Sequence, residues 1–312
     1  RHDLADIFCN TSEGVRGQKA KDWRLVDEVA KPAVFGQKLQ ERIAALSAQS
    51  SRPFEAKPVV LPPLQRRDDD QGVHYNHVDV TIDRAKRSAT VLVKAPNAAQ
   101  PTDIAGIEAL GAAWWPLAMA RELDDAILHL RTNELDVGTW ILKTEGDSAR
   151  VLEVDASLRT HGEHWLVKET VGLLRRTLAR LDVSSRSLFT LIEPGSCFAG
   201  VLAELVFCAD RSYMAHLPSD AAREPKLTLT PSNLGLYPMV TAQSRLARRF
   251  YEEASPMAAC AEASGRPLTA PQALELGLVT AAPDDLDWAD EIRLALEERA
   301  AMSPDALTGL RS

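Results

Sequence analysis

The most regular stretch of the chain alternates apolar and polar side chains. Val78, Val80 and Ile82 alternate with polar residues, a polar turn follows at 83–87, and an apolar run resumes at 90–93. Alternation with a period of two places one face of a strand against a core, and two such runs around a short turn are typical of a β-hairpin. The pattern therefore predicts a hairpin here.

Helical and strand-like patterns follow one another after this hairpin. Leu117–Arg131 and Trp165–Leu181 carry apolar residues every three or four positions and are predicted to be amphipathic helices. Continuous apolar runs within 137–146 and 187–196 predict buried strands, and 199–210 predicts an apolar helix. Strands that alternate with helices in this way are typical of an α/β domain.

The C-terminal part is predicted to be almost entirely helical. Helices are expected over 244–254, 270–276 and 288–300. A final short helix is expected from Ser303 and Pro304, because Ser is a favoured N-cap and Pro fits the first helical position.

The first 73 residues lack the α/β pattern. Residues 1–50 are predicted to be helical, with helices at Arg16–Trp23 and Gly36–Ala48. Residues 51–73 contain four prolines, the charged run RRDDD and few apolar side chains. We therefore expect them to form a linker with a solvated surface.

A segment near the start of the chain resembles one near its end. The segments are EGVRGQKAKDWRLVD, which ends at Asp27, and RPLTAPQALELGLVT, which ends at Thr280. An offset of 253 residues aligns Leu25 with Leu278, and in both segments a helix stops at an apolar residue followed by Val. A Pro-containing turn and an amphipathic helix come next in each. The repeat predicts two copies of one domain, of which the first contributes only its last portion.

Composition excludes several classes of function. A net charge of −8 over 312 residues argues against nucleic acid as the main partner, because binding to phosphates needs a basic surface. No run reaches the ~18 apolar residues of a membrane span. The four cysteines form no CxxC pair, so reduced thiols in a cytoplasmic protein are expected. The chain begins with Arg1 rather than Met, and we expect it to be part of a longer polypeptide.

A turn of small residues is the first candidate site. Pro194–Gly200 joins a predicted buried strand to a predicted apolar helix. Small residues allow a ligand to approach the backbone, and N–H groups at the start of the helix could bind an oxyanion. An oxyanion donor of this kind is typically worth ~3–4 kcal/mol to a transition state. The alternative is a plain turn without chemistry.

Two carboxylates lie close to this turn in the sequence. Glu204 is surrounded by apolar residues, so its pKa could be raised and it could act as an acid or a base. Glu193 precedes the turn and is a second candidate acid or base. The alternative for both is a solvated or ion-paired side chain.

Other candidate residues are weaker. Cys197 would be a nucleophile only if its thiolate were stabilised at a helix N-terminus, and a small buried Cys is the simpler interpretation. His161 and His164 lack the HExxH arrangement and an evident third ligand, so no metal site is predicted. Lys94, Arg211 and Arg248 are candidate cations for a phosphate-bearing substrate, with nothing to choose between them.

Four motifs resemble the crotonase (enoyl-CoA hydratase/isomerase) family, over residues 76–312. They are HVDVTIDRAKRSATVLVKAP, IEPGSCFAGVLAELVFCAD, LTLTPSNLGLYPMVTAQSRLARRFY and RPLTAPQALELGLVTAAPDD. Glu204 and Asp210 lie six residues apart, as in the family pattern. The resemblance implies an α/β crotonase-like ββα spiral with a helical C-terminal region. It also implies a tail of a preceding copy at 1–50, a linker at 51–73 and a second crotonase-like domain at 74–312.

The tandem arrangement resembles the ring-opening lyases of this family. These act on 2,3-dihydro-2,3-dihydroxybenzoyl-CoA and yield a semialdehyde CoA thioester and formate. The resemblance implies an acyl-CoA substrate, no cofactor beyond the CoA of that substrate, and a homo-oligomer, with a dimer favoured. Among the residues of this chain, Glu204 and the backbone of Gly200 are the predicted catalytic groups.

The chain departs from the family pattern at both expected oxyanion donors. The family's AGxD turn is replaced by Leu152–Asp155, which keeps only the Asp, and its GGG run is replaced by Phe198–Val201. We therefore hypothesise that the main catalytic pocket lies in the other copy and that this domain supports it. The alternatives are a non-catalytic structural or oligomerisation domain and a simple enoyl-CoA hydratase or isomerase.

Overall fold

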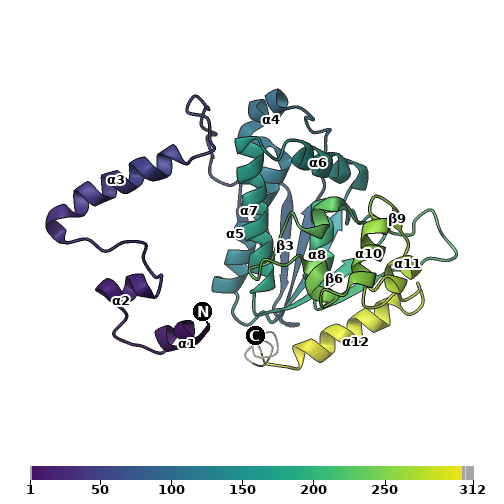
Figure 1. The fold of residues 1–312 in the computed structure, drawn as a ribbon. Helices are drawn as coiled ribbons and strands as arrows, with labels where there is room; N and C mark the ends of the chain where they lie inside the picture. The colour runs from purple at the N-terminus through teal and green to yellow at the C-terminus, as the bar shows by residue number, and fades with distance from the viewer. Residues whose placement is uncertain (1, 304–305, 307–312) are drawn as a thin grey trace. The chain divides into compact units, whose positions relative to one another are not determined.

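The computed structural model describes residues 2–303 and 306, and the chain forms two compact units, Arg1–Ala56 and Lys57–Ser312. The first unit is helical (Figure 1, purple). Its elements are α1 His2–Cys9, α2 Gly17–Asp22, the 3-10 turn η1 Pro32–Val34 and α3 Phe35–Ala48. Among the described residues of this unit, Ala20 is the only buried hydrophobic side chain. The unit therefore has almost no core of its own.

The second unit is built on a seven-stranded sheet with the order β1-β2-β3-β4-β5-β6-β7. Its strands are β1 Arg67–Asp69, β2 Gly72–His74, β3 Val78–Asp83, β4 Ser88–Lys94, β5 Thr139–Glu145, β6 Ser187–Ile192 and β7 Arg211–Met214. Neighbours from β1 to β4 are antiparallel, and those from β4 to β7 are parallel. A separate two-stranded sheet pairs β8 Leu227–Thr228 with β9 Pro267–Leu268.

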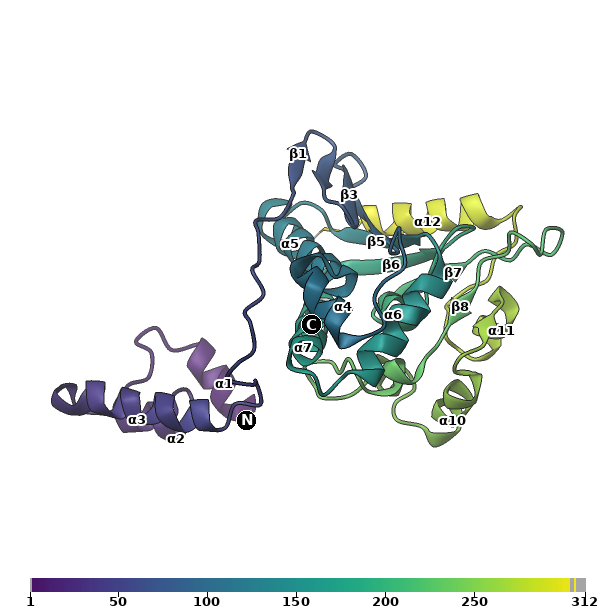
Figure 2. The same cartoon turned by 90° about the horizontal axis from the view of Figure 1, so that it is seen from above.

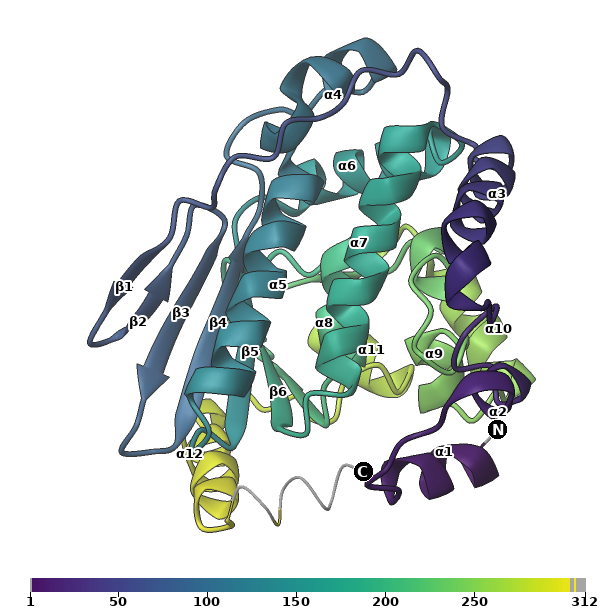
Figure 3. The same cartoon turned by 90° about the vertical axis from the view of Figure 1, so that its left-hand side faces the viewer.

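Helices cover both faces of the large sheet. The helices of the second unit are α4 Ile104–Leu110, α5 Trp115–Asn133, α6 Ser148–Thr160, α7 Trp165–Asp182, α8 Glu204–Phe207, α9 Arg245–Arg249, α10 Ala254–Ala263, α11 Ala270–Glu275 and α12 Trp288–Ala300. Short 3-10 turns lie at η2 Gly111–Ala113, η3 Gly200–Ala203 and η4 Pro231–Leu234. Helices α5 and α7 run side by side along one face (Figure 3).

The alternation of side chains along the strands explains why the large sheet carries an apolar cluster on each of its two faces. On β5, Trp140 and Leu142 join the main core, whereas Ile141 between them joins a smaller cluster with Phe189 and Ile292. Successive side chains of a strand point to opposite faces, so these two clusters lie on opposite sides of the sheet. Helix α12 covers the side away from α5 and α7 (Figure 2).

Most of the predicted elements are confirmed. The hairpin is β3–β4, the two amphipathic helices are α5 and α7, and the two buried strands are β5 and β6. Helices α2, α3, α11 and α12 also follow their predicted ranges within one or two residues. None of the helices among the described residues is both long and apolar enough to cross a bilayer.

Three expectations differ from the structure. The predicted linker 51–73 contains β1 and most of β2, because the Asp69 carboxylate accepts hydrogen bonds from the Gln71 and Gly72 N–H groups and closes a hairpin. The helix expected over 199–210 is a 3-10 turn followed by a four-residue α-helix. The helix expected over 244–254 ends at Arg249, and α10 follows from Ala254. The helix expected from Ser303 and Pro304 lies largely outside the described residues.

Candidate functional site

Two backbone donors of the turn after β6 are satisfied within the domain. The Ser196 N–H donates to the Glu193 carbonyl at 3.0 Å, and the Cys197 N–H donates to Thr144 Oγ1 at 2.9 Å. The Gly146 N–H, at the end of β5, donates to the Gly195 carbonyl at 3.1 Å. The expected oxyanion donors are the N–H groups at the start of the following helical segment, at Gly200 and Val201, so the pairing of the Ser196 and Cys197 N–H groups leaves that expectation a prediction. The parallel neighbour β5 ends beside the turn and supplies their partners.

Gly200 is required by its surroundings. Its φ is +48°, which favours glycine, and a Cβ there would lie 2.8 Å from the Asp155 side chain. Asp155 is fully buried on α6, and its Oδ2 accepts from Arg159 Nε at 3.2 Å. Close packing between Gly200 and Asp155 therefore explains the glycine without any ligand.

Glu204 lies in a buried polar network. Its Oε1 accepts from Asn233 Nδ2 at 2.8 Å, and its Oε2 accepts from Arg245 Nη1 at 2.8 Å. The Asn233 amide also donates to the Gly200 carbonyl at 2.9 Å. Both predicted catalytic residues are thus tied to one side chain, Asn233.

Arg245 extends this network to the end of α7. Its Nε and Nη2 donate to the two carboxylate oxygens of Asp182 at 3.0 and 2.7 Å, and its Nη1 also donates to the Tyr237 carbonyl at 2.8 Å. The network joins α7, η3, α8, η4 and α9. Bidentate geometry of this kind is among the strongest charge-assisted hydrogen bonding in proteins.

Burial controls the electrostatics of these groups. Glu204 is only 1% exposed, and burial raises its pKa while the neighbouring Arg245 charge offsets part of that rise. Burial likewise raises the pKa of Asp155, with Ser232 and Thr230 acting in the opposite direction. The predicted raised pKa of Glu204 agrees with this direction. However, both of its oxygens are occupied, so the geometry describes a structural ion pair more readily than an acid poised toward substrate.

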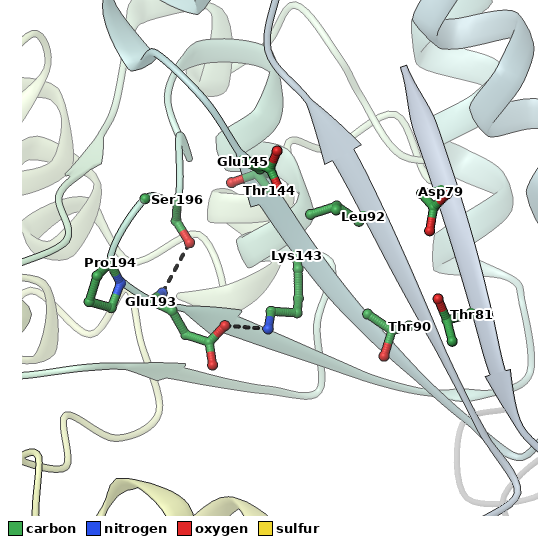
Figure 4. A pocket seen from close by; sticks show the side chains of 11 residues that line it. Asp79, Thr81, Thr90, Leu92, Lys143, Thr144, Glu145, Glu193, Pro194 and Ser196 are labelled. Carbon is green, nitrogen blue, oxygen red and sulfur yellow. Dashed lines mark hydrogen bonds and ion pairs between the residues drawn. The ribbon is translucent and has the colours of Figure 1, made fainter. Parts of the chain in front are cut away.

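Glu193 is separate from this network. It pairs with Lys143 on β5, and both side chains line a groove with Thr90, Thr81 and other residues of β3 and β4 (Figure 4). The groove has a volume of about 260 Å³. Small-molecule sites usually span ~300–1,000 Å³, so this groove is small for a CoA thioester.

The remaining candidates show no catalytic geometry. Cys197 is fully buried, and burial raises the pKa of its thiol to about 11, which disfavours a thiolate nucleophile. His161 Nε2 lies 2.8 Å from the Thr102 carbonyl, and His164 Nε2 lies 3.4 Å from Glu108. No group of His, Cys, Asp and Glu with metal-binding geometry occurs among the described residues.

Sequence reasoning did not identify the partners of Glu204. Asn233 and Arg245 both lie within the third motif, yet a motif does not show which of its polar residues meet in space. Asp182 ends an amphipathic helix, where an acidic residue is ordinarily solvated. The one local signal for an ordered Asn233 was the sequence TPSN at 230–233. An Asn at the third helical position can form a capping box with a Thr at the N-cap, as Asn233 and Thr230 do.

Comparison with curated proteins identifies a homologue. The chain is 57% identical over its whole length to the benzoyl-CoA-dihydrodiol lyase of Aromatoleum evansii. It spans 56% of that protein, which is about half the length of the relative. No protein-family model matches the chain.

Solved structures establish the fold. An enoyl-CoA hydratase/carnithine racemase from Magnetospirillum magneticum matches 76% of this chain and 79% of its own, with 18% identity and a TM-score of 0.53. An enoyl-CoA hydratase from Bacillus halodurans matches 76% of this chain and 85% of its own, with 15% identity and a TM-score of 0.52. The predicted crotonase-like α/β fold is therefore confirmed.

Proposed function

We propose that this chain, a homologue of benzoyl-CoA-dihydrodiol lyase with a crotonase-like fold, is the C-terminal portion of a ring-opening lyase. The substrate would be 2,3-dihydro-2,3-dihydroxybenzoyl-CoA, and the products a semialdehyde CoA thioester and formate, with one water consumed. The identity of 57% along the entire chain supports this assignment. The resemblance further implies that the thioester enolate is stabilised by backbone N–H groups, with no cofactor apart from the CoA of the substrate.

Within that lyase, we assign the second unit a supporting role. The observation that carries this assignment is the buried hydrogen-bond network around Glu204. Asn233 and Arg245 donate to its two carboxylate oxygens, so neither oxygen is free. An acid or base must reach a substrate proton within about 2.6–3.2 Å or through one water, and in this structure Glu204 is 1% exposed and hydrogen-bonded within the domain. Chemistry would then occur in the part of the lyase outside this chain.

A simple hydratase or isomerase working from this domain is the weaker alternative. It would need an accessible carboxylate and a pair of outward N–H donors at the turn. Glu204 is buried, and both of its carboxylate oxygens accept hydrogen bonds within the domain, which argues against this alternative. The other properties inferred from the resemblance, a cytoplasmic homo-oligomer with a dimer favoured, remain proposals.

Formate release tests the assignment. The dihydrodiol substrate would be given to this chain alone, to the Aromatoleum evansii lyase, and to a chimera in which this chain replaces the matching part of that lyase. We expect formate from the lyase and the chimera and none from the chain alone. Formate from the folded chain alone would place the chemistry within these residues and refute the supporting role.

Glu204→Gln in the chimera separates catalysis from support. Gln keeps the shape of the side chain but removes its charge. If Glu204 is only structural, the substitution changes turnover only by lowering the fraction of folded protein, which denaturation measures. A catalytic acid or base contributes ~10²–10⁴-fold to the rate. A loss of that size in a fully folded variant would contradict our assignment. Glu298→Gln, at a carboxylate whose side chain is 55% exposed, is the matched control.

A further inference from the structure

The helices of the first unit repeat the last helices of the second at a constant offset. A shift of 253 residues places α1 within α10, superposes α2 on α11 and starts α3 where α12 starts. The offset is the one that aligns Leu25 with Leu278. Three helices with unchanged spacing show that the repeat extends well beyond the 15 residues that first revealed it.

The backbone conformation repeats as well. Arg24 has a φ of +59° and its counterpart Gly277 has a φ of +69°. A non-glycine residue adopts this conformation at a cost of about 1–2 kcal/mol. Three hydrogen bonds end α2, and three bonds at the corresponding positions end α11. In α2, the N–H groups of Trp23, Arg24 and Leu25 donate to the carbonyls of Lys19, Lys21 and Ala20 at 3.0, 2.9 and 2.9 Å. In α11, the N–H groups of Leu276, Gly277 and Leu278 donate to the carbonyls of Gln272, Leu274 and Ala273 at 3.1, 2.9 and 2.9 Å.

Burial is where the two copies differ. Leu278 and Val279 are 0% and 3% exposed, whereas Leu25 and Val26 are each 44% exposed. The same contrast holds for the following helix. Ile292 of α12 is buried, and its counterpart Leu39 of α3 is exposed, as are Phe35 and Ile43 on the same side of α3. The first unit therefore presents the apolar face of a packed structure without its packing partner.

The second unit shows what that partner is. After Val279 the chain runs along β7, where the Thr280 N–H donates to the Ser212 carbonyl at 2.8 Å and the Met214 N–H donates to the Ala281 carbonyl at 3.0 Å. Helix α12 then lies over the outer face of the sheet. Its cluster contains the sheet residues Ile141, Phe189, Leu191 and Tyr213.

The corresponding place in the first unit is an open groove. It is lined by Asp27, Glu28, Ala30, Phe35, Lys38, Leu39 and Arg42. Shifted by 253 residues, four of these positions are Ala281, Trp288, Ile292 and Ala295, which all belong to the cluster over the sheet. Four positions that line the groove thus correspond to positions that contact the sheet in the second unit.

We propose that residues 25–48 dock on a second body of the same fold, with residues 27–30 added to the edge of its last parallel strand and α3 laid across its sheet. This rests on the proposed function, because that body would be the part of the lyase outside this chain. The chain spans 56% of the relative over 313 residues, which leaves about 245 residues. That is close to the length of the unit Lys57–Ser312.

A second copy of this chain does not offer the same docking surface. In the second unit, residues 280–283 already pair along β7, and α12 already covers the face. An occupant must instead have a sheet whose last parallel edge and outer face are both uncovered. A crotonase-like body without these trailing helices meets that requirement.

Backbone hydrogen exchange tests the docking. The Asp27 and Glu28 N–H groups correspond to those of Thr280 and Ala281, which both donate to the Ser212 carbonyl. In the chain alone, we expect exchange to be fast at Asp27 and Glu28 and slow at Thr280 and Ala281. In the chimera with the Aromatoleum evansii lyase, exchange at Asp27 and Glu28 should slow by at least roughly tenfold. If the chimera does not fold, exchange is measured in the unmodified Aromatoleum evansii lyase, at the backbone amides that align with those of Asp27 and Glu28.

Two outcomes would overturn the proposal. Fast exchange at Asp27 and Glu28 in both the folded chimera and the relative would show that no strand is paired there. Protection in the chain alone, together with a dimeric mass, would identify a second copy as the occupant. Leu39→Asp in the chimera should restore fast exchange, and Gln40→Asp on the neighbouring exposed position should not. Because exchange does not depend on formate release, failure of the docking and failure of the lyase assignment are distinguishable.

Discussion

At the scale of single residues, Arg245 is the centre of the second unit's polar core. One guanidinium contacts Glu204, Asp182 and the Tyr237 carbonyl, and it is 2% exposed. Two carboxylates around one buried cation leave a net negative charge, which Asn233 stabilises by donating to Glu204. Such a network specifies which elements meet, although its net contribution to stability can be small.

Arg245→Met should be strongly destabilising, because it leaves two buried carboxylates without their cation. We expect the free energy of unfolding to fall by ~3–5 kcal/mol, measured by urea denaturation. Arg248→Met, at an exposed position of the same helix, should change it by no more than ~0.5 kcal/mol. Equal effects of the two substitutions would show that the network contributes little.

The buried carboxyl of Asp155 should make stability depend on pH. Its pKa is raised in the folded state, so its contribution to stability is present below the ordinary Asp value of 3.8 and is lost as pH rises through the folded pKa. Asp155→Asn cannot ionise, so the variant should gain stability relative to the wild type as the pH increases from ~3.5 to ~7. Paired unfolding curves at both pH values measure this, and a difference that does not vary with pH would contradict it.

At the scale of elements, α3 and α12 show that a similar amphipathic pattern can have different environments. Both helices start at the same position of the repeat and carry apolar residues at corresponding sites. In this chain only α12 has a sheet to cover. Most helical stability comes from packing of the apolar face, so the two helices should contribute unequally.

Matched substitutions on the two helices should differ in effect when made in this chain alone. Ile292→Asp places a charge in a buried cluster and should cost ~2–4 kcal/mol of unfolding free energy. Leu39→Asp, at the corresponding exposed position, should cost at most ~0.5 kcal/mol in the same urea titration. A comparable loss for Leu39→Asp would mean that α3 is already packed in the chain alone.

At the scale of the whole molecule, one set of helices occurs twice, in two different environments. The second unit has its own trailing helices and a complete core, and the first unit contains matching helices almost without one. A crotonase-like body needs both the sheet and these helices to bury its outer face. The first unit therefore contains these helices without the sheet that they cover in the second unit.

Strands and helices were predicted more accurately than side-chain roles. β3, β4, α5 and α7 follow from apolar periodicity, and β5 and β6 follow from continuous apolar runs, which are both local signals. β1 was missed because its three residues are charged and exposed, and β2 because its three residues are too few to show an alternation. β2 pairs with the edge of β3, and β1 pairs with β2. Helix α6 was missed even though Asp147 caps it by accepting from the Ala149 N–H at 2.9 Å.

The sequence by itself determined the fold class, the order of the main strands and helices, and the repeat at an offset of 253 residues. These depend on patterns within short segments and on similarity between segments. Only the tertiary structure decided that Glu204 is buried in an ion pair and not exposed to a substrate. Its ion pair with Arg245 joins residues that are 41 positions apart in the sequence, and the ion pair of Arg245 with Asp182 joins residues that are 63 positions apart. No local pattern dictates such contacts. They arise when packing brings distant polar groups together and burial makes an unpaired charge too costly.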